Sequence, residues 1–151
     1  PHSHIHMRGL VLPEACVTDR QVAQYLLDSF VSLVEKDFAT AVAHPFCPVG
    51  RTPENVKAIL DCITDDEFAR CFSAARAHNA AIEINGSCMA GEWSTPALVA
   101  GYERLFSIAR DCGVTFTLGS DAHAPKELEY IHLAAQLATR LAIPDDRFLR
   151  L

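Results

Sequence analysis

Three short apolar segments of the sequence each end in a side chain that can bind a metal ion. The segments and the residues that follow them are Thr40–Ala43 with His44, Ala80–Ile84 with Asn85, and Val114–Leu118 with Asp121 and His123. Short apolar runs bounded by turn residues are typical of buried strands. Ligand-type residues at the carboxyl ends of successive parallel strands are typical of a β/α barrel active site. This arrangement limits the fold more strongly than any other feature of the chain.

Helical patterns alternate with these segments. Helix starts are indicated by N-cap threonines followed by proline or glutamate, and apolar side chains recur at helical spacing after each start. The expected helices are Asp19–Lys36, Pro53 to about Leu60, one beginning after Thr64, one beginning after Thr95 and closed by Gly113, and one from about Pro125 to Leu141. Pro1–Met7 alternates apolar and polar residues like a fourth strand.

Four strands alternating with helices predict parallel pairing and the α/β fold class. No linker interrupts the 151 residues, so we expect a single domain over residues 1–151. Four β/α units are only about half of an eight-stranded barrel. The sequence therefore predicts either an open sheet or a partial barrel whose other half lies elsewhere. Four strands alone would leave two free sheet edges, which a homodimer or a longer polypeptide could cover.

Composition excludes several function classes. The 13 Lys and Arg residues are outnumbered by 19 Asp and Glu residues, for a formal charge of −6, which argues against nucleic-acid binding. No apolar stretch is long enough to span a bilayer and no secretory signal is visible, so we expect no membrane partner. The six cysteines contain no C-x-x-C pair and are interpreted as reduced thiols, which favours a cytoplasmic protein.

Asp121 and His123 are the strongest candidates for metal ligands. Asp and His two residues apart, on a chain leaving a strand, can converge on one ion. The alternative is that Asp121 caps the helix that starts near Pro125, with His123 on the surface. His44 ends another strand and is either a third ligand or a satisfied core histidine.

Histidines also gather at the N-terminus. His2, His4 and His6 share one face of the expected strand, and the alternative is the remnant of an expression tag. His6 is the best ligand candidate there and His4 the next. Arg8 follows and could hold a phosphate through two hydrogen bonds, or could be a surface arginine.

Glu83 and Asn85 share one face of their strand, on either side of Ile84. If Ile82 and Ile84 face the helices, the carboxylate and the amide point toward the barrel interior, where each needs a partner. We expect a role for both at the site, together with Arg8 as a catalytic candidate.

The candidate ligands indicate the chemistry. Histidine nitrogens mixed with a carboxylate suit zinc, manganese or iron better than calcium. One or more such ions would generate hydroxide near neutral pH and clamp phosphoryl oxygens during in-line attack. No G-x-S-x-G, P-loop or G-x-G-x-x-G motif offers another mechanism.

Three motifs together resemble the PHP (polymerase and histidinol phosphatase) superfamily. They are Ala-His-Pro at 43–45, Ile-Glu-Ile-Asn at 82–85 and Gly-Ser-Asp-Ala-His at 119–123, in the order found in that family. The resemblance implies a distorted seven-stranded β/α barrel that binds up to three metal ions and hydrolyses phosphoesters. By matching position it makes His44, Asp121 and His123 metal ligands and gives His6 or His4 the place of an earlier strand-end ligand.

The family's first H-x-H motif and its ligating Glu have no counterpart, so the chain resembles the C-terminal half of a PHP domain. The function expected is a metal-dependent phosphoesterase acting on a small phosphoester. The alternative is a truncated or degenerate half-barrel that binds metal or serves as a structural unit without catalysis. A metal-dependent amidohydrolase is disfavoured, because no strand ends in a lysine that could bridge two metals.

Overall fold

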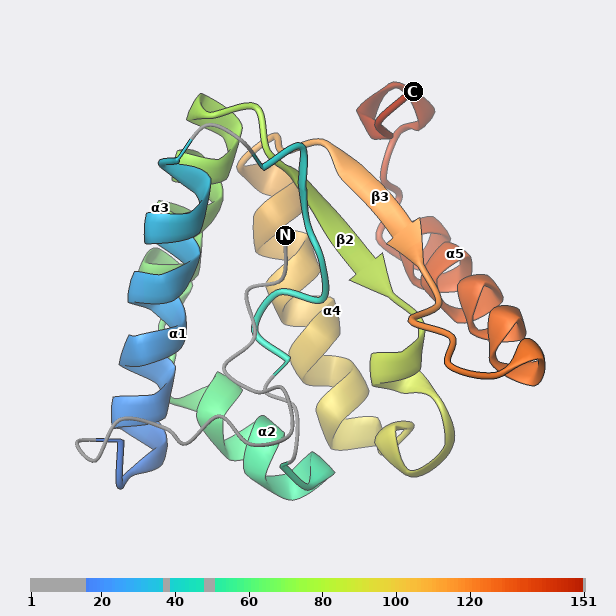
Figure 1. Ribbon diagram of the computed structural model, residues 1–151, viewed down its shortest axis with the longest axis horizontal. Coiled ribbons are helices and arrows are strands. Elements are labelled where there is room, and N and C mark those ends of the chain that lie inside the picture. The colour runs from blue at the N-terminus through green and yellow to red at the C-terminus, as the bar shows by residue number, and fades with distance from the viewer. Residues whose placement is uncertain (1–15, 37–38, 48–50, 151) are drawn as a thin grey trace.

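The computed structural model describes residues 16–36, 39–47 and 51–150, which form a parallel sheet packed with helices (Figure 1). The strands are β1 (Ala41–Val42), β2 (Ala81–Asn85) and β3 (Phe116–Gly119), and they lie side by side in that order. Their registers pair Ala41 with Ala81 and Ile82 with Phe116. The α/β class and three of the four expected strands are confirmed, with bounds that differ by one or two residues. The expected strand Pro1–Met7 lies outside the described residues.

Five α-helices accompany the strands in the described part of the chain. They are α1 (Asp19–Val34), α2 (Pro53–Asp61), α3 (Asp65–Ala77), α4 (Pro96–Asp111) and α5 (Ile131–Arg140). Helices α1 to α4 pack against one another, whereas α5 packs on β2 and β3. In Figure 1, α5 lies beside β3, on the side away from α1 and α3.

The helix starts follow the capping pattern expected from the sequence. The side chains of Thr52 and Thr95 accept hydrogen bonds from backbone N–H groups in the first turns of α2 and α4, and each helix has Pro at its start. Thr64 and Glu67 form a reciprocal capping box at α3. Gly113 follows α4 with φ +76°, the left-handed conformation that glycine adopts without strain.

The last expected helix is two elements instead of one. Pro125–Tyr130 forms a 3-10 helix, η3, and the α-helix begins only at Ile131. The N–H of Glu127 donates to the carbonyl of Ala124 three residues earlier, so the first turn is tighter than an α-turn. Tight packing accompanies it, because the backbone of Tyr130 lies against Gly86, at the end of β2.

Aromatic side chains in the core hold the loop that follows β1. Phe46 is 1% exposed and its ring stacks on Phe30 of α1, with centroids 5.1 Å apart. The edges of Phe68 and Phe72 in α3 meet the same ring nearly at right angles. Burial of a phenylalanine side chain stabilises a fold by about 1.5–3 kcal/mol. The core therefore fixes the chain two residues after His44.

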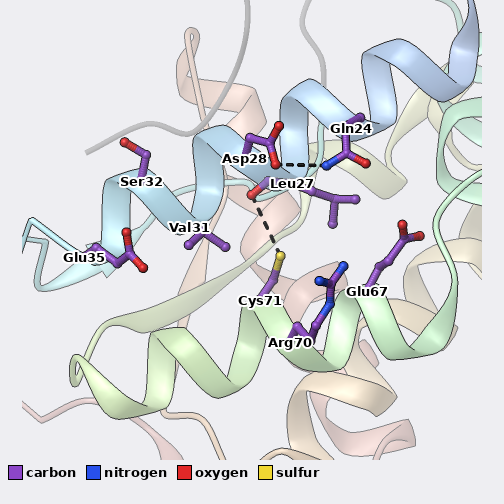
Figure 2. Close-up of a pocket in the computed structure, with 9 residues that line it drawn as sticks. All are labelled: Gln24, Leu27, Asp28, Val31, Ser32, Glu35, Glu67, Arg70 and Cys71. Carbon is purple, nitrogen blue, oxygen red and sulfur yellow. Dashed lines mark hydrogen bonds between the residues drawn. The ribbon is translucent and has the colours of Figure 1, made fainter.

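Helices α1 and α3 lie next to each other and leave a shallow groove of about 330 Å³ between them (Figure 2). Gln24 donates a hydrogen bond to Asp28 on the α1 side, and the thiol of Cys71 on α3 points to the carbonyl of Leu27. Burial raises the pKa of Cys71 to about 12. All six cysteines are free thiols in this structure.

The sheet does not close into a barrel within the described residues. Beyond β3, Phe148 forms an isolated parallel bridge to Phe116, and the N–H of Leu149 donates to the carbonyl of Phe116 at 2.9 Å. The described residues are compatible with part of an α/β fold. No helix in the described ranges is long and apolar enough to cross a membrane.

Candidate functional site

The carboxyl ends of the three strands carry the predicted site residues to one edge of the sheet. His44 follows β1, Asn85 ends β2, and Asp121 and His123 follow β3. Asn85 and Gly119 are direct partners in the register of the parallel sheet, so these ends are level with one another. His44 is 6% exposed and His123 is an exposed side chain, so the site extends from the interior to the surface.

Asp121 lies between the two histidines. Its Oδ1 is 3.8 Å from Nε2 of His44 and 3.7 Å from Nε2 of His123. The structure therefore brings together the three described residues that the sequence nominated as ligands. The alternative role of Asp121 as a helix cap is not observed, because Ala124 is the N-cap of η3 and the carboxylate of Glu127 accepts from the N–H groups of His123 and Ala124.

Two of these residues have left-handed backbones. The φ angles are +29° for His44 and +50° for Asp121. Positive φ is uncommon for residues other than glycine and costs about 1–3 kcal/mol, so surrounding contacts must hold it. Such backbone strain clusters at functional sites. These two turns bring the His44 and Asp121 side chains to within 3.8 Å of each other.

Glu83 supplies one of the holding contacts. Its Oε2 accepts a hydrogen bond from the backbone N–H of His44 at 2.8 Å and another from Nδ2 of Asn85 at 3.1 Å. Ile82 and Ile84 on the other face are fully buried in the core, as the alternation predicts. Glu83 therefore acts on the site through His44.

Gly119 makes room for that carboxylate. A Cβ atom built on Gly119 would overlap Oε1 and Cδ of Glu83. Glycine at the first position of Gly-Ser-Asp-Ala-His therefore leaves the Glu83 carboxylate in its present place, and a larger residue would make that side chain move. The motif therefore supplies both the candidate ligands, Asp121 and His123, and the space that the Glu83 carboxylate occupies.

Asn85 is 2% exposed and organises the turn after β2. Its Oδ1 accepts hydrogen bonds from the backbone N–H of Ser87 at 2.8 Å and from the Ser87 hydroxyl at 2.7 Å. Both ends of the amide are therefore used, one toward Glu83 and one toward Ser87. Asn85 is a positioning residue in this structure.

A pocket of about 380 Å³ opens beside Asp121 and His123. Its wall includes Trp93 and Tyr130, together with Glu92. Sequence reasoning did not identify these wall residues, because single aromatic residues in loops carry no periodic signal. The pocket gives Asp121 and His123 access to solvent through a partly apolar cleft.

Two cysteines at the inner wall were also missed as site residues. The thiol of Cys88 donates a hydrogen bond to Sγ of Cys47, with the sulfurs 3.1 Å apart. This hydrogen bond lowers the pKa of Cys47 and raises that of Cys88 well above its usual value. Burial raises the pKa of the neighbouring Tyr102 phenol. Their positions, 41 residues apart in sequence, gave no spacing signal.

The predicted N-terminal residues His4, His6 and Arg8 lie outside the described residues. Within the described ranges, no group of three or more His, Cys, Asp or Glu side chains is arranged to hold a metal ion. His44 and His123 instead form two neighbouring pairs with Asp121.

The chemistry of the donors nevertheless suits a divalent first-row ion. Two imidazole nitrogens flank one carboxylate oxygen, the mixed set that zinc, manganese and iron accept. Metal–ligand bonds are about 2.0–2.3 Å, so two ligands of one ion lie roughly 3–4 Å apart. The separations from Asp121 to the imidazoles of His44 and His123 are within that range.

No family model matches the sequence. The chain is 36% identical over 88 residues to a probable phosphatase of Vibrio vulnificus strain YJ016, a match that covers 56% of this chain and 34% of that protein. It is 31% identical over 83 residues to a probable phosphatase of Aliivibrio fischeri, covering 55% and 33%. A probable phosphatase of Vibrio cholerae is 32% identical over 85 residues, covering 56% and 34%. The match therefore spans about a third of the length of these curated relatives.

Proposed function

We propose that this chain carries the C-terminal half of a metal-dependent phosphoesterase of the PHP type, acting on a small phosphoester. The observation that carries the proposal is the position of Asp121 between His44 and His123 at the carboxyl edge of the sheet. The relatives named probable phosphatases support the same reaction class. The partial (β/α)7 barrel of that family is the architecture we propose around the three described strands.

In this proposal His44, Asp121 and His123 hold one divalent ion, zinc, manganese or iron, and His4 or His6 completes the set. When bound, such an ion supplies a Lewis acid and lowers the pKa of a coordinated water. Further ions and the phosphate-binding role of Arg8 belong to the same proposal.

Glu83 and Asn85 then position the proposed ligands. Glu83 fixes the backbone of His44, and Asn85 fixes both Glu83 and the following turn. Residues that orient ligands in this way usually change metal affinity 10–100-fold when they are mutated. The pocket next to Asp121 and His123 receives the part of the substrate beyond the phosphate.

A second candidate function has its own supporting observation. The described residues form two ligand pairs and no group of three. A degenerate half-barrel that binds metal weakly, or serves as a structural unit without catalysis, would have this property.

Metal content and turnover distinguish the two functions. The chain is purified without a tag, loaded with zinc or manganese, and assayed by elemental analysis and by hydrolysis of p-nitrophenyl phosphate before and after chelation. One or more tightly held ions with chelator-sensitive turnover supports the phosphoesterase. Weakly held metal without turnover supports the half-barrel.

Asp121→Asn removes the central charge with little change in shape, and we expect metal affinity and turnover to fall together. Asp146→Asn is the matched control, because Asp146 is an exposed carboxylate in the 3-10 helix η4 (Asp145–Arg147), outside the site. Unchanged metal affinity in Asp121→Asn would contradict the assignment of Asp121 as a ligand.

A further inference from the structure

Cys47 and Cys88 bring two thiols into contact at the wall of the site pocket. Cys47 lies on the loop after β1, three residues beyond His44, and Cys88 lies in the 3-10 helix η1 (Ser87–Met89), just after β2. Their sulfurs are 3.1 Å apart. The segments that follow β1 and β2 are thus in contact through the sulfur atoms of Cys47 and Cys88.

The other cysteines have different surroundings. The thiols of Cys16, Cys71 and Cys112 have backbone carbonyl oxygens as their recorded partners. No other sulfur–sulfur hydrogen bond is recorded in the described part of the chain. The Cys47–Cys88 contact is therefore a specific pair and not a consequence of the number of cysteines.

Cys47 and Cys88 differ in their exposure to solvent. Both cysteines line the pocket, but Cys47 is half-buried whereas Cys88 is 6% exposed. Tyr102, which is 1% exposed, neighbours both thiols. Because Cys47 is the more exposed of the two residues, a reagent that enters the pocket meets Cys47 more readily.

We propose that Cys47 and Cys88 form a reversible dithiol–disulfide pair, with Cys47 as the attacking thiol and Cys88 as the resolving thiol. The co-reactant is a low-molecular-weight disulfide of the glutathione class. Nothing in this proposal requires metal binding or phosphatase activity.

The exchange proceeds in two balanced steps. The sulfur of Cys47 attacks one sulfur of the small disulfide, whose S–S bond breaks and whose other half leaves as a thiol with the proton of Cys47. The sulfur of Cys88 then attacks the sulfur of Cys47 in this mixed disulfide, and the second small thiol leaves with the proton of Cys88. Two cysteine thiols are oxidised, and one small disulfide is reduced to two thiols.

Little movement is needed for the second step. A disulfide bond is about 2.05 Å long, so the sulfurs must approach by about 1 Å. The N–H of Cys47 donates to the carbonyl of His44 at 3.3 Å. The bond would therefore tie the turn that carries His44 to the segment after Asn85, next to the candidate ligands.

The first test uses the whole chain without added metal. The protein is equilibrated in buffers of increasing oxidised-to-reduced glutathione ratio, free thiols are alkylated, and peptides are mapped by mass spectrometry. We expect one linked peptide pair containing Cys47 and Cys88, lost after treatment with dithiothreitol. Alkylation of both cysteines at the most oxidising ratio, or a link to another cysteine instead, would overturn the proposal.

Variants assign the order of attack. Cys88→Ser should trap one glutathione on Cys47, whereas Cys47→Ser should leave Cys88 unmodified in the folded protein. Cys112→Ser is the matched control, a half-buried thiol outside the pocket, and should still form the pair. Circular dichroism verifies folding of each variant. Glutathione bound stably to Cys47 in the unmodified chain would show that Cys88 does not resolve it.

A trivalent arsenical, phenylarsine oxide, gives a second measurement, because it binds two adjacent thiols at once. We expect one equivalent bound by the unmodified chain and by Cys112→Ser, and loss of tight binding in either pair variant. Equal binding by all four proteins would contradict a thiol pair at this position.

Discussion

The carboxylate of Glu83 accepts a hydrogen bond from the backbone N–H of His44 at 2.8 Å across 39 residues of sequence. His44 has a left-handed backbone and is also the candidate ligand nearest the core. The interaction therefore joins the centre of β2 to the turn after β1 and helps to hold that turn in a strained conformation. Glu83 contributes to the site by positioning another residue.

Replacing Glu83 by alanine should destabilise the fold and weaken metal binding together. The lost acceptor leaves the His44 N–H without this carboxylate, at a cost of about 1–3 kcal/mol in the free energy of unfolding. Metal affinity should fall by roughly 10–100-fold. Urea denaturation and zinc titration measure the two effects. Glu129→Ala, at an exposed carboxylate, is the control. A loss of stability with unchanged zinc affinity would show that Glu83 does not position a metal ligand.

Gly119→Ala should lower stability although alanine suits a strand better than glycine. The new methyl group would displace the Glu83 carboxylate from its hydrogen bonds, at an expected cost of about 1–3 kcal/mol. In the double variant with Glu83→Ala, the cost of Gly119→Ala should largely vanish, which a double-mutant cycle measures.

Gly101→Ala is the matched control for Gly119→Ala. Gly101 lies inside α4, and a Cβ there would make only ordinary contacts. Alanine should therefore stabilise the helix by about 0.5–1 kcal/mol. If both alanine variants stabilise the protein, the prediction that Gly119 makes room for the Glu83 carboxylate is wrong.

Glu67 should make stability depend on pH in the acid range. Hydrogen bonds from Arg20 hold the pKa of Glu67 at about 2 in the folded protein, below about 4.3 for an unfolded glutamate. Its contribution is complete above pH 4.3 and is lost as pH falls toward 2.

Because Arg20 is half-exposed, solvent limits this contribution to about 0.5–1 kcal/mol. Glu67→Gln should therefore lower the free energy of unfolding at pH 7 by that amount and change it much less near pH 2. Urea denaturation at both pH values tests the prediction. Equal losses at the two pH values would mean that the charge of Glu67 is not responsible.

Self-association is a further prediction, taken from the open sheet. In the described part of the chain, β1 is at one end of the strand order and is followed by a single β-bridge residue, Ala43, and β3 is followed only by the single bridge at Phe148. Unpaired strand edges favour association, and a symmetric dimer is the commonest result. Light scattering over a range of concentrations should detect a dimer, and a monomer throughout would contradict the prediction.

The sequence predicted those parts of the fold that depend on local chemistry. Threonine caps, proline at helix starts and Gly113 have short-range causes, and the structure confirms them. The division of Pro125–Leu141 into η3 and α5 was not predicted, because it accompanies packing of Tyr130 on Gly86, 44 residues away in sequence.

The candidate site was predictable to a similar extent. Strand-end positions identified His44, Asp121 and His123, because parallel strands deliver their carboxyl ends to one edge. The thiol pair and the pocket wall were not found, because they depend on how two loops fold back on each other. The proposed metal roles of these histidines remain predictions.

Gly86 has a consequence for how distant relatives of this chain can be recognised. A Cβ at this position would overlap the backbone carbonyl of Tyr130, so every larger side chain would force β2 and η3 apart. Selection should therefore retain glycine here in any descendant that keeps the two segments in contact, including descendants that have lost catalysis. The glycine is thus a requirement of the architecture, and its presence alone would be a poor guide to activity.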